Sequence, residues 1–449
     1  MKTTLRQLAT WAQGKVNGAD VVVTGISIDS RAVQPGDVFV AIRGDNFDGH
    51  EFLTMAKEKG AVAAVVAQPQ TVFAEAVNVA DTRAALGHIA AAWGKHCTAH
   101  HIAITGNSGK TTVKEMLAHL FSQAPYLATA GNFNNEIGVP LTLLRLEPQH
   151  DYGIFELGAN HQGEIAWTAS LVQPEVGIIT NVTGAHLEGF GSMAGIASAK
   201  AELVAQVRNL LVLNKEGGFY DTFAKAAEAA NVPVCSVSVH GSAEFVAQEI
   251  VCGSNGVSFR CQHQEGCFAI SVPLPGEHQV ANALQAIAVA RFYGLSWEHI
   301  QVQLASLPSV PGRLQRKPLG EGVVLDDTYN ANPGSVAAAM RYLATQPAPR
   351  MLVFGGMGEL GAASEVEHQR IGKLAQALGL TALVTVGELA QPTAQTFGPT
   401  AVQCVTHAEV LPHAQQILQQ GGSVLVKGSR SAKMEKVIAN LFDQQKETH

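Results

Sequence analysis

A glycine-containing loop between a strand and a helix constrains the fold of this 449-residue chain more than any other feature. Residues 105–112, TGNSGKTT, follow the apolar run HIAI and precede an amphipathic helical pattern. Gly106 and Gly109 allow backbone N–H groups to turn toward an anion, and the start of the helix adds a positive dipole. A chance glycine turn is the alternative, but the GKTT run before a helix disfavours it. The pattern predicts a nucleoside-triphosphate-binding loop in an α/β sheet.

The residues of this loop divide the expected contacts with the nucleotide among them. Lys110 is expected to reach the terminal phosphates, and the Thr111 hydroxyl to ligate Mg²⁺. The loop is a shortened variant, because only two residues separate Gly106 from Gly109. The predicted ATP-binding residues of the loop are Thr105, Gly106, Asn107, Ser108, Gly109, Lys110, Thr111 and Thr112.

Length and composition indicate a large globular protein. At roughly 150 residues per domain, 449 residues favour three domains. Hydrophobic residues at 47% and charged residues at 15% exclude a disordered chain. The net charge of −7, without a Lys/Arg block, argues against a nucleic-acid partner. We expect a cytoplasmic protein with free thiols and no membrane insertion, because the N-terminus lacks a signal-like apolar core and no apolar run approaches the roughly 20 residues that span a bilayer.

The order of strand-like and helical segments predicts an α/β fold in three domains. Residues 1–81 form a small N-terminal α/β domain, residues 82–312 a central domain built on a parallel P-loop sheet, and residues 313–449 a Rossmann-like C-terminal domain. Residues 234–274 depart from the βα alternation and are richer in short alternating strands. The segment SVPGR at residues 309–313 predicts a hinge before the third domain.

Two residues outside the loop are candidate metal ligands. Glu156 ends the strand-like run YGIFE, and His186 follows another strand, so both are expected at the sheet edge where such folds bind ligands. Carboxylate oxygen suits Mg²⁺ better than imidazole does. Both residues also have an ordinary interpretation, Glu156 as a cap or ion-pair partner and His186 as a hydrogen-bonded loop residue. Lys200, in the helical segment ASAKAELV, would ordinarily be a solvated helix lysine.

The order of the motifs resembles that of the Mur ligases, the ATP-dependent amide ligases of peptidoglycan synthesis. The motifs are TGNSGKTT, FELG, NVTGAHLEGFGS with AKAEL, GEHQVANALQA, VPGR and LDDTYNANP, and they span essentially the whole chain. An ordered set is far more specific than the phosphate loop alone. It favours functional roles for Glu156, His186 and Lys200.

The resemblance implies two Mg²⁺ sites and a set of nucleotide contacts. Thr111 and Glu156 would hold one ion, and His186 the other together with a carbamylated Lys200. A carbamate suits the ion because it supplies anionic oxygen where an ammonium would be repelled. Lys110, His186 and Lys200 are the implied catalytic residues. The remaining implied contacts are Asn282 to adenine, Arg313 to the phosphates, Asp327 to ribose, and Tyr329, Asn330 and Asn332 near the nucleotide and the hinge.

Three stretches of the sequence indicate which member of the family the chain resembles. Residues 29–52 resemble the uridine-nucleotide-binding domain of members that add the third residue or the terminal dipeptide, which implies that Ser30 and Arg31 meet a uridine diphosphate. GNFNNEIGVP and DDTYNANPGS are similar to the members that add D-alanyl-D-alanine, and the DNPR signature of the diaminopimelate-adding member is absent. The implied substrate residues are Asn134, Asn135, Asn332, Lys427, Ser429 and Arg430. Solvated charges at a helix start are the alternative for the last three.

The expected reaction is ATP-dependent addition of D-alanyl-D-alanine to a UDP-muramoyl tripeptide through an acyl phosphate. Domain closure at the hinge would exclude water from that intermediate. We expect a monomer with small-molecule partners. The rival interpretations are a third-residue-adding Mur ligase, a folate-type polyglutamate ligase, which would lack the N-terminal module, and a P-loop NTPase switch. The sequence leaves the third residue of the tripeptide open, as either diaminopimelate or lysine.

Overall fold

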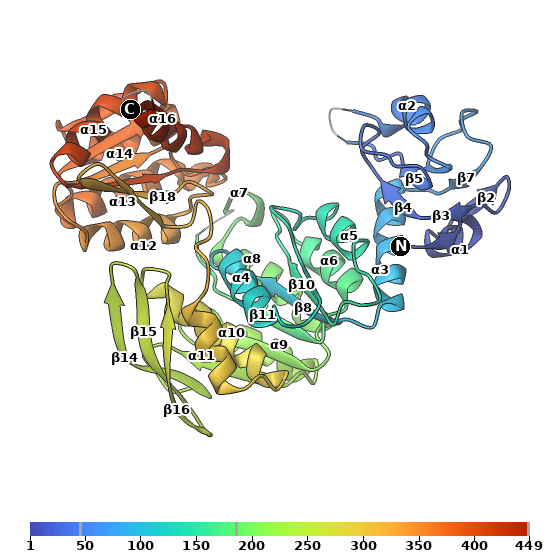
Figure 1. The fold of residues 1–449 in the computed structure, drawn as a ribbon, viewed down its shortest axis with the longest axis horizontal. Helices are drawn as coiled ribbons and strands as arrows, with labels where there is room; N and C mark the ends of the chain where they lie inside the picture. Colours follow the sequence, from blue (N-terminus) through green and yellow to red (C-terminus); the bar gives the residue numbers. More distant parts are fainter. Residues whose placement is uncertain (45–46, 185–186, 447–449) are drawn as a thin grey trace.

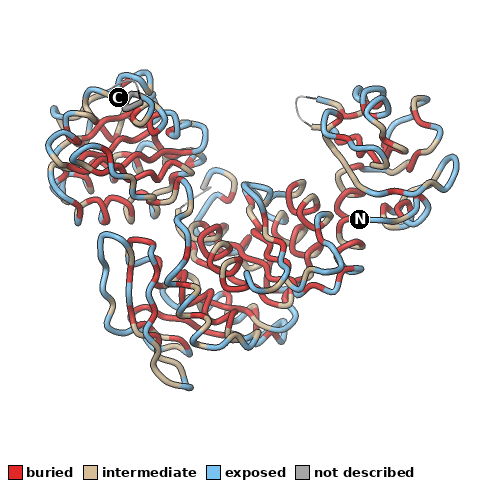
Figure 2. Tube along the Cα trace, in the orientation of Figure 1, coloured by how far each residue is buried: buried red, intermediate tan, exposed pale blue. Residues whose placement is uncertain are grey.

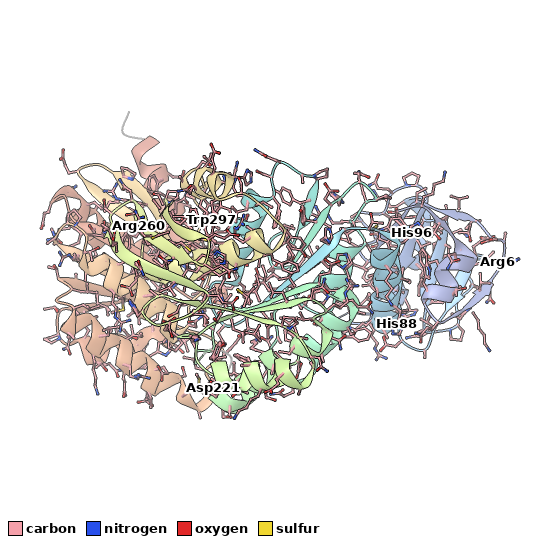
Figure 3. The ribbon with its side chains drawn as sticks, turned by 90° about the horizontal axis from the view of Figure 1, so that it is seen from below. Arg6, His88, His96, Asp221, Arg260 and Trp297 are labelled. Carbon is pink, nitrogen blue, oxygen red and sulfur yellow. The ribbon has the colours of Figure 1, made fainter. Side chains whose placement is uncertain are left out.

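The computed structural model describes residues 1–44, 47–184 and 187–446. Figure 1 shows three bodies: an N-terminal unit in blue, a central unit from cyan to yellow, and a C-terminal unit in orange and red. Helix α3 (Thr82–His96) stands between the first two and packs against α1 (Leu5–Trp11), α5 (Gly138–Leu143) and α6 (Glu164–Val172). Figure 3 shows Arg6 at the outer end of the N-terminal unit, with His88 and His96 marking α3 beside it. Within these described ranges, no helix is long and apolar enough to cross a membrane.

The N-terminal unit is built on a small five-stranded sheet. Strands β4, β5, β6 and β7 pair in parallel, β2 pairs with β7 in antiparallel, and β1 with β3 forms a separate antiparallel pair. Val38, Val40 and Val65 are fully buried between the sheet and its helices. The elements besides α1 are β1 (Thr3–Thr4), β2 (Lys15–Asn17), β3 (Val22–Val23), β4 (Gly25–Ser27), β5 (Asp37–Val40), η1 (Gly49–Phe52), α2 (Leu53–Glu58), β6 (Ala63–Val66) and β7 (Ala76–Asn78).

The central unit holds a nine-stranded sheet in the order β16-β15-β14-β13-β12-β11-β8-β10-β9. Strands from β9 to β14 pair in parallel, whereas β14, β15 and β16 pair in antiparallel. The strands are β8 (His100–Thr105), β9 (Tyr126–Ala128), β10 (Tyr152–Glu156), β11 (Val176–Ile179), β12 (Leu210–Asn214), β13 (Val234–Ser238), β14 (Phe245–Gly253), β15 (Gly256–His263) and β16 (Gly266–Val272). The departure from βα alternation predicted for residues 234–274 is therefore an antiparallel extension of the sheet.

Helices cover both faces of the central sheet, and this explains the continuous apolar strands. Ile102, Ala103 and Ile104 of β8 are all fully buried, although neighbouring side chains on a strand point to opposite faces. Figure 2 shows the same burial along the central strands. The helices besides α3, α5 and α6 are α4 (Lys110–Leu120), α7 (Leu187–Phe190), α8 (Met193–Ala201), η2 (Val204–Gln206), α9 (Tyr220–Ala229), α10 (His278–Phe292) and α11 (Trp297–Ala305).

The C-terminal unit is a doubly wound sheet in the order β17-β18-β22-β19-β20-β21, parallel except for the edge strand β17. Its strands are β17 (Gln315–Leu319), β18 (Gly322–Asp327), β19 (Arg350–Phe354), β20 (Ala382–Val386), β21 (Ala401–Cys404) and β22 (Ser423–Lys427). Its helices are α12 (Pro333–Ala344), η3 (Gly361–Ala363), α13 (Ser364–Ala377), η4 (Glu388–Ala390), α14 (Gln391–Phe397), η5 (Ala408–Val410), α15 (Leu411–Gln419), η6 (Arg430–Ala432) and α16 (Glu435–Lys446). The predicted fold class, α/β in three domains, is confirmed, while the exact boundaries at residues 81 and 312 stay predictions.

Candidate active site

The loop between β8 and α4 requires glycine at two positions. Gly106 has φ +137° and Gly109 has φ +84°, a region that side chains with a Cβ rarely adopt. A Cβ on Gly106 would overlap the Thr180 hydroxyl, and a Cβ on Gly109 would lie 2.5 Å from Asn282 Oδ1. Helix α4 begins directly after Gly109, so the first-turn N–H groups of α4 have no carbonyl partner within their own helix. The turn therefore presents a helix N-terminus suited to an anion.

Polar groups at the end of β11 hold this loop in place. The backbone N–H groups of Asn107 and Ser108 donate to Asn181, to its carbonyl at 3.1 Å and its side-chain oxygen at 3.0 Å. The Thr180 hydroxyl donates to the Ser108 carbonyl at 2.6 Å. Asn181 and Thr180 were not predicted as site residues, although both follow the buried strand β11, whose sequence is VGII. Their position at a strand end is like that of Glu156 on β10. Two loop amides are thus occupied within the protein, and the first turn of α4 is left to meet a phosphate.

Lys110 folds back over the loop. Its Nζ donates to the carbonyl oxygens of Gly106 at 2.7 Å and Asn107 at 3.4 Å. Burial lowers the pKa of Lys110, the Glu156 carboxylate acts in the opposite direction, and Arg313 lowers it further. The ammonium therefore lies at the centre of the loop, in the electrostatic field of both an acidic and a basic residue.

Thr111 and Glu156, predicted to share a metal ion, are in direct contact. The Thr111 hydroxyl donates to Glu156 Oε2 at 2.8 Å, and Asn134 Nδ2 donates to Glu156 Oε1 at 2.9 Å. Thr111 and Glu156 are both buried, so the carboxylate is fixed by its neighbours rather than by solvent. Hydroxyl and carboxylate oxygens are the ligands that Mg²⁺ prefers, so this pair fits the ion chemically.

Arg313 brings a cation from the start of the C-terminal unit to this pair. Its Nη2 donates to the Thr111 hydroxyl at 2.7 Å, and its guanidinium carbon lies 4.3 Å from the centroid of the Tyr329 ring. The Arg313 Nε is buried and has no hydrogen-bond partner among the residues that the structure describes. Because an unpaired buried donor is costly, this N–H is positioned for an acceptor that arrives with the ligand. A phosphate oxygen meets that requirement.

The adjacent ends of strands β18 and β22 hold a second charged pair. Lys427 Nζ donates to Asp327 Oδ2 at 2.5 Å and to the Asn330 carbonyl at 2.9 Å, while the Leu314 N–H donates to Asp327 Oδ1 at 3.1 Å. Lys427 is fully buried. Desolvation lowers the pKa of His278, Asp327 raises it and Lys427 lowers it, which places this imidazole within electrostatic reach of the pair. His278 lies in the motif GEHQVANALQA but was not predicted to be a site residue.

Asn332 joins the C-terminal unit to the phosphate loop. Its Nδ2 donates to the Ser108 hydroxyl at 3.1 Å, while its Oδ1 accepts the Ser335 N–H at 2.9 Å and so caps α12. A second contact lies nearby, where the Glu188 N–H of α7 donates to the Glu359 carbonyl at 3.4 Å. Figure 1 shows α7 at the top of the central unit, facing the C-terminal unit. Residues from the two units therefore meet at the loop that is expected to hold the phosphates.

Lys200 is buried, contrary to the solvated alternative for a helix lysine. It is 1% exposed near the end of α8, and its Nζ lies 5.4 Å from the centroid of the Phe190 ring. The pKa of Lys200 is lowered to about 7, chiefly by burial and also by the charge of Lys110, while Glu202 and Glu164 oppose the shift. Among the described residues no carboxylate forms an ion pair with Lys200, and a buried cation without a close counter-charge favours the neutral amine. The predicted ligand His186 lies outside the residues that the structure describes.

The predicted uridine-nucleotide contacts lie in the N-terminal unit. The Arg31 Nε and Nη2 donate to the two carboxylate oxygens of Asp29 at 2.9 and 2.8 Å, although the Arg31 side chain is 82% exposed. This pairing lowers the pKa of Asp29 to about 2. The Ser30 hydroxyl is buried and donates to Met55 Sδ at 3.3 Å. Figure 1 shows this unit at the far side of α3 from the C-terminal unit.

The remaining predicted residues have local partners. The Thr105 hydroxyl donates to the Leu157 carbonyl at 2.9 Å, and the Asn282 Nδ2 donates to Gln279 Oε1 at 2.9 Å. Asn135 Oδ1 accepts the Gly138 N–H at 2.9 Å at the start of α5, which gives it a structural contact. Ser429 is buried with its hydroxyl 3.1 Å from that of Ser431, whereas Arg430 is exposed and lies 3.6 Å from Glu435. Thr112 is buried inside α4.

The chain matches three domain descriptions of one family along its length. They are "Mur ligase family, catalytic domain" at residues 22–94, "Mur ligase middle domain" at residues 104–290 and "Mur ligase, glutamate ligase domain" at residues 312–430. The UDP-N-acetylmuramoyl-tripeptide--D-alanyl-D-alanine ligase of Escherichia coli (strain K12) is 41% identical, with 98% of each chain covered. The ligase of the same name from Haemophilus influenzae is 37% identical, with 99% of each covered. A crystal structure of MurF from Acinetobacter baumannii superposes with a TM-score of 0.93 at 36% identity, covering 99% of each chain.

Proposed function

The chain belongs to the Mur ligase family, and from that premise we propose that it adds D-alanyl-D-alanine to a UDP-N-acetylmuramoyl tripeptide at the expense of ATP. The products are the UDP-linked pentapeptide, ADP and phosphate. The relatives that carry this activity in their names align with nearly the whole chain, including the N-terminal unit. That coverage disfavours a folate-type polyglutamate ligase, which is expected to lack this unit.

The observation that carries the proposal is the junction of Lys110, Thr111 and Arg313 at one glycine loop. A carboxylate and an amine do not form an amide usefully in water, so the carboxylate must first be activated. The terminal carboxylate of the tripeptide attacks the γ-phosphorus of ATP, ADP leaves, and an acyl phosphate forms. Lys110, Arg313 and the first-turn amides of α4 bind the phosphoryl oxygens and neutralise their charge. No protein nucleophile takes part.

The second half-reaction uses the same positioned groups. The amine of D-alanyl-D-alanine attacks the acyl carbon and the amide carbon–nitrogen bond forms. The bond between the acyl carbon and the phosphate oxygen breaks, inorganic phosphate leaves with that oxygen, and the amine nitrogen releases a proton. Alignment of the two substrates can supply roughly 7 to 11 kcal/mol of the barrier reduction. Contacts from the C-terminal unit, through Arg313 and Asn332, help to exclude water from the acyl phosphate. Lys427, Ser429 and Arg430 remain proposed contacts to the substrates.

Thr111 and Glu156 are the residues that would hold Mg²⁺. Their oxygen atoms already face one another, and Asn134 keeps the carboxylate in that orientation. When bound, the ion supplies a positive charge that polarises the phosphoryl oxygens. Asn282 and Asp327 are proposed to bind adenine and ribose, with Tyr329 and Asn330 beside them.

Lys200 is proposed to carry a carbamate. Carbon dioxide adds to a neutral amine, a carbon–nitrogen bond forms, and a proton is released. The burial of Lys200, which lowers its pKa to about 7, keeps a large fraction of the amine neutral near neutral pH. His186 is proposed to act with it.

The cytoplasmic location and the monomeric state of the enzyme also stay predictions.

An amide-forming assay with a panel of UDP-linked peptides tests the proposal. Purified enzyme should release phosphate only when both the UDP-muramoyl tripeptide and D-alanyl-D-alanine are present, and mass spectrometry should detect the pentapeptide. Comparing tripeptides that end in diaminopimelate and in lysine identifies the third residue. Equal ATP hydrolysis without either substrate would indicate a P-loop NTPase switch instead. Product formation with a dipeptide substrate and a free diamino acid would indicate a third-residue-adding ligase.

A further inference from the structure

Lys114 is a buried cation that the proposed reaction does not use. It lies one turn after Thr111 on α4, and its side chain is 5% exposed. Its Nζ donates to the Thr129 carbonyl at 2.8 Å and pairs with Glu115 Oε1 at 2.6 Å. The Glu115 side chain is 39% exposed, so one side of this ion pair reaches solvent while the lysine does not.

A buried ammonium is costly to desolvate, and that cost is offset only where the charge is paired and hydrogen-bonded. A methionine of similar length would fill the same space without that cost. The carbonyl that Lys114 binds belongs to a residue that is itself buried, directly after β9. The contact therefore ties the helix of the phosphate loop to the strand beside β10.

Thr129 uses all three of its polar groups to join these elements. Its N–H donates to the Ile154 carbonyl at 3.0 Å, its hydroxyl accepts the Glu156 N–H at 3.0 Å, and its carbonyl accepts from Lys114. Thr129 thus holds the backbone of Glu156 through its hydroxyl, and Lys114 holds Thr129 through its carbonyl.

The segment that follows Thr129 fixes the side chain of the same glutamate. Residues 130–134 turn back toward β10, and Asn134 Nδ2 donates to Glu156 Oε1 at 2.9 Å. The Asn134 carbonyl accepts the Gly158 N–H at 2.8 Å, which holds the returning end of the segment. Thr129 and Asn134, at the two ends of residues 129–134, therefore both contact the end of the strand that carries Glu156, and Lys114 holds Thr129.

We propose that Lys114 is a positioning residue, which sets the Glu156 carboxylate for Mg²⁺ by holding Thr129 against β10. This inference rests on the proposed nucleotide site, because Glu156 is assigned to the ion there. Lys114 contacts neither substrate nor ion in this role. Its removal displaces the Thr129 carbonyl and loosens the bond that the Glu156 N–H makes to the Thr129 hydroxyl.

The test measures ADP binding to the purified full-length protein by isothermal titration calorimetry, with Mg²⁺ and with a chelator. Wild type should bind ADP more tightly when Mg²⁺ is present. In Lys114→Met, the factor by which Mg²⁺ increases the affinity for ADP should be at least tenfold smaller than in wild type. The affinity for ADP without Mg²⁺ should stay within about twofold of the wild-type value. Lys114→Arg, which restores a cationic donor, should recover much of the gain.

Two further variants keep the inference testable if Lys114→Met does not fold. Thr129→Val removes the acceptor of the Glu156 N–H and should reproduce the loss, whereas Thr129→Ser should retain the gain. Lys317→Met is the matched control, because Lys317 pairs with Asp326 at 2.7 Å in the C-terminal unit, and it should behave as wild type.

Two outcomes overturn the inference. Wild-type Mg²⁺ dependence in Lys114→Met, or in Thr129→Val where the first variant does not fold, would remove the positioning role. An equal loss of affinity with and without Mg²⁺ would show a general effect on the loop instead. Failure of wild type itself to bind ADP would be a different result, since it would contradict the proposed function.

Discussion

Arg313 and Thr111 are 202 residues apart in the chain, yet the Arg313 guanidinium donates to the Thr111 hydroxyl at 2.7 Å. The bond joins the start of the C-terminal unit to the first turn of the phosphate-loop helix. It brings a second cation to the loop, in addition to Lys110. The proposed nucleotide site is therefore built from both units.

Replacing Arg313 should therefore weaken ATP binding. A hydrogen bond from a charged group contributes about 1.5 to 3 kcal/mol, which corresponds to roughly a 10- to 100-fold rise in the KM for ATP in Arg313→Ala. The KM for D-alanyl-D-alanine should change little. Steady-state kinetics with each substrate varied in turn provide the measurement. Arg316→Ala is the control, because Arg316 is exposed on β17, and equal effects of the two changes would contradict the assignment.

Gly109 should not tolerate alanine. The substitution imposes a positive φ on a residue with a Cβ, at roughly 1 to 2 kcal/mol, and places that Cβ 2.5 Å from Asn282 Oδ1. We expect at least a tenfold loss of ADP affinity, measured by calorimetry. Gly294→Ala provides the comparison, since Gly294 has φ +81° with nothing within 4 Å of its Cβ position. It should lower stability modestly and leave ADP affinity unchanged, and a similar affinity loss in both variants would argue against a local effect at the loop.

Lys200→Ala should abolish ligation, and small carboxylic acids should restore part of it by replacing the carbamate. Lys225→Ala, at an exposed position on α9, should remain fully active. Full activity of Lys200→Ala without added acid would remove this residue from the site.

The activity of wild type should also depend on carbon dioxide and pH. With a pKa of about 7, the neutral amine fraction of Lys200 rises as the pH increases through 7 and falls below it. Enzyme preincubated at pH 6 without bicarbonate should thus start slowly and recover at pH 8 with bicarbonate. Initial rates after timed preincubation test this, with ¹³C-bicarbonate NMR to detect the carbamate. Rates independent of bicarbonate at both pH values would count against the modification.

Arg31→Ala should raise the KM for the UDP-linked tripeptide at least tenfold. Arg31 is exposed, and two hydrogen bonds from its Nε and Nη2 to Asp29 already orient the guanidinium, so its remaining N–H donors on Nη1 and Nη2 can bind a diphosphate with little loss of side-chain entropy. ADP binding should be unaffected. Arg6→Ala is the matched control in the same unit, at the outer end shown in Figure 3. An unchanged KM in Arg31→Ala would place the uridine nucleotide elsewhere.

The sequence predicted those parts of the site that follow from strand ends and glycine spacing. The phosphate loop and Glu156 belong to neighbouring strands, so their meeting at one sheet edge was predictable. Asn181 carried the same signal after β11 and was overlooked. The Ser108–Asn332 contact was not predictable at residue level, because it depends on how two domains dock. Lys114 gave no signal at all, since a lysine on an amphipathic helix normally faces water.

The short turn that links the central and C-terminal units has a mechanical consequence. The Gly312 carbonyl accepts the Tyr329 N–H, and the Leu314 N–H donates to Asp327, so the turn is fastened on both sides of Arg313 to the end of β18 and the loop after it. If the C-terminal unit swings, these bonds make the turn travel with it, and the pivot would lie before the turn. Arg313 would then be withdrawn from the phosphates by the same swing that opens the enzyme to its acceptor. Binding of the triphosphate and entry of the acceptor substrate would then depend on the same motion, so a variant that stiffens the pivot should alter both together.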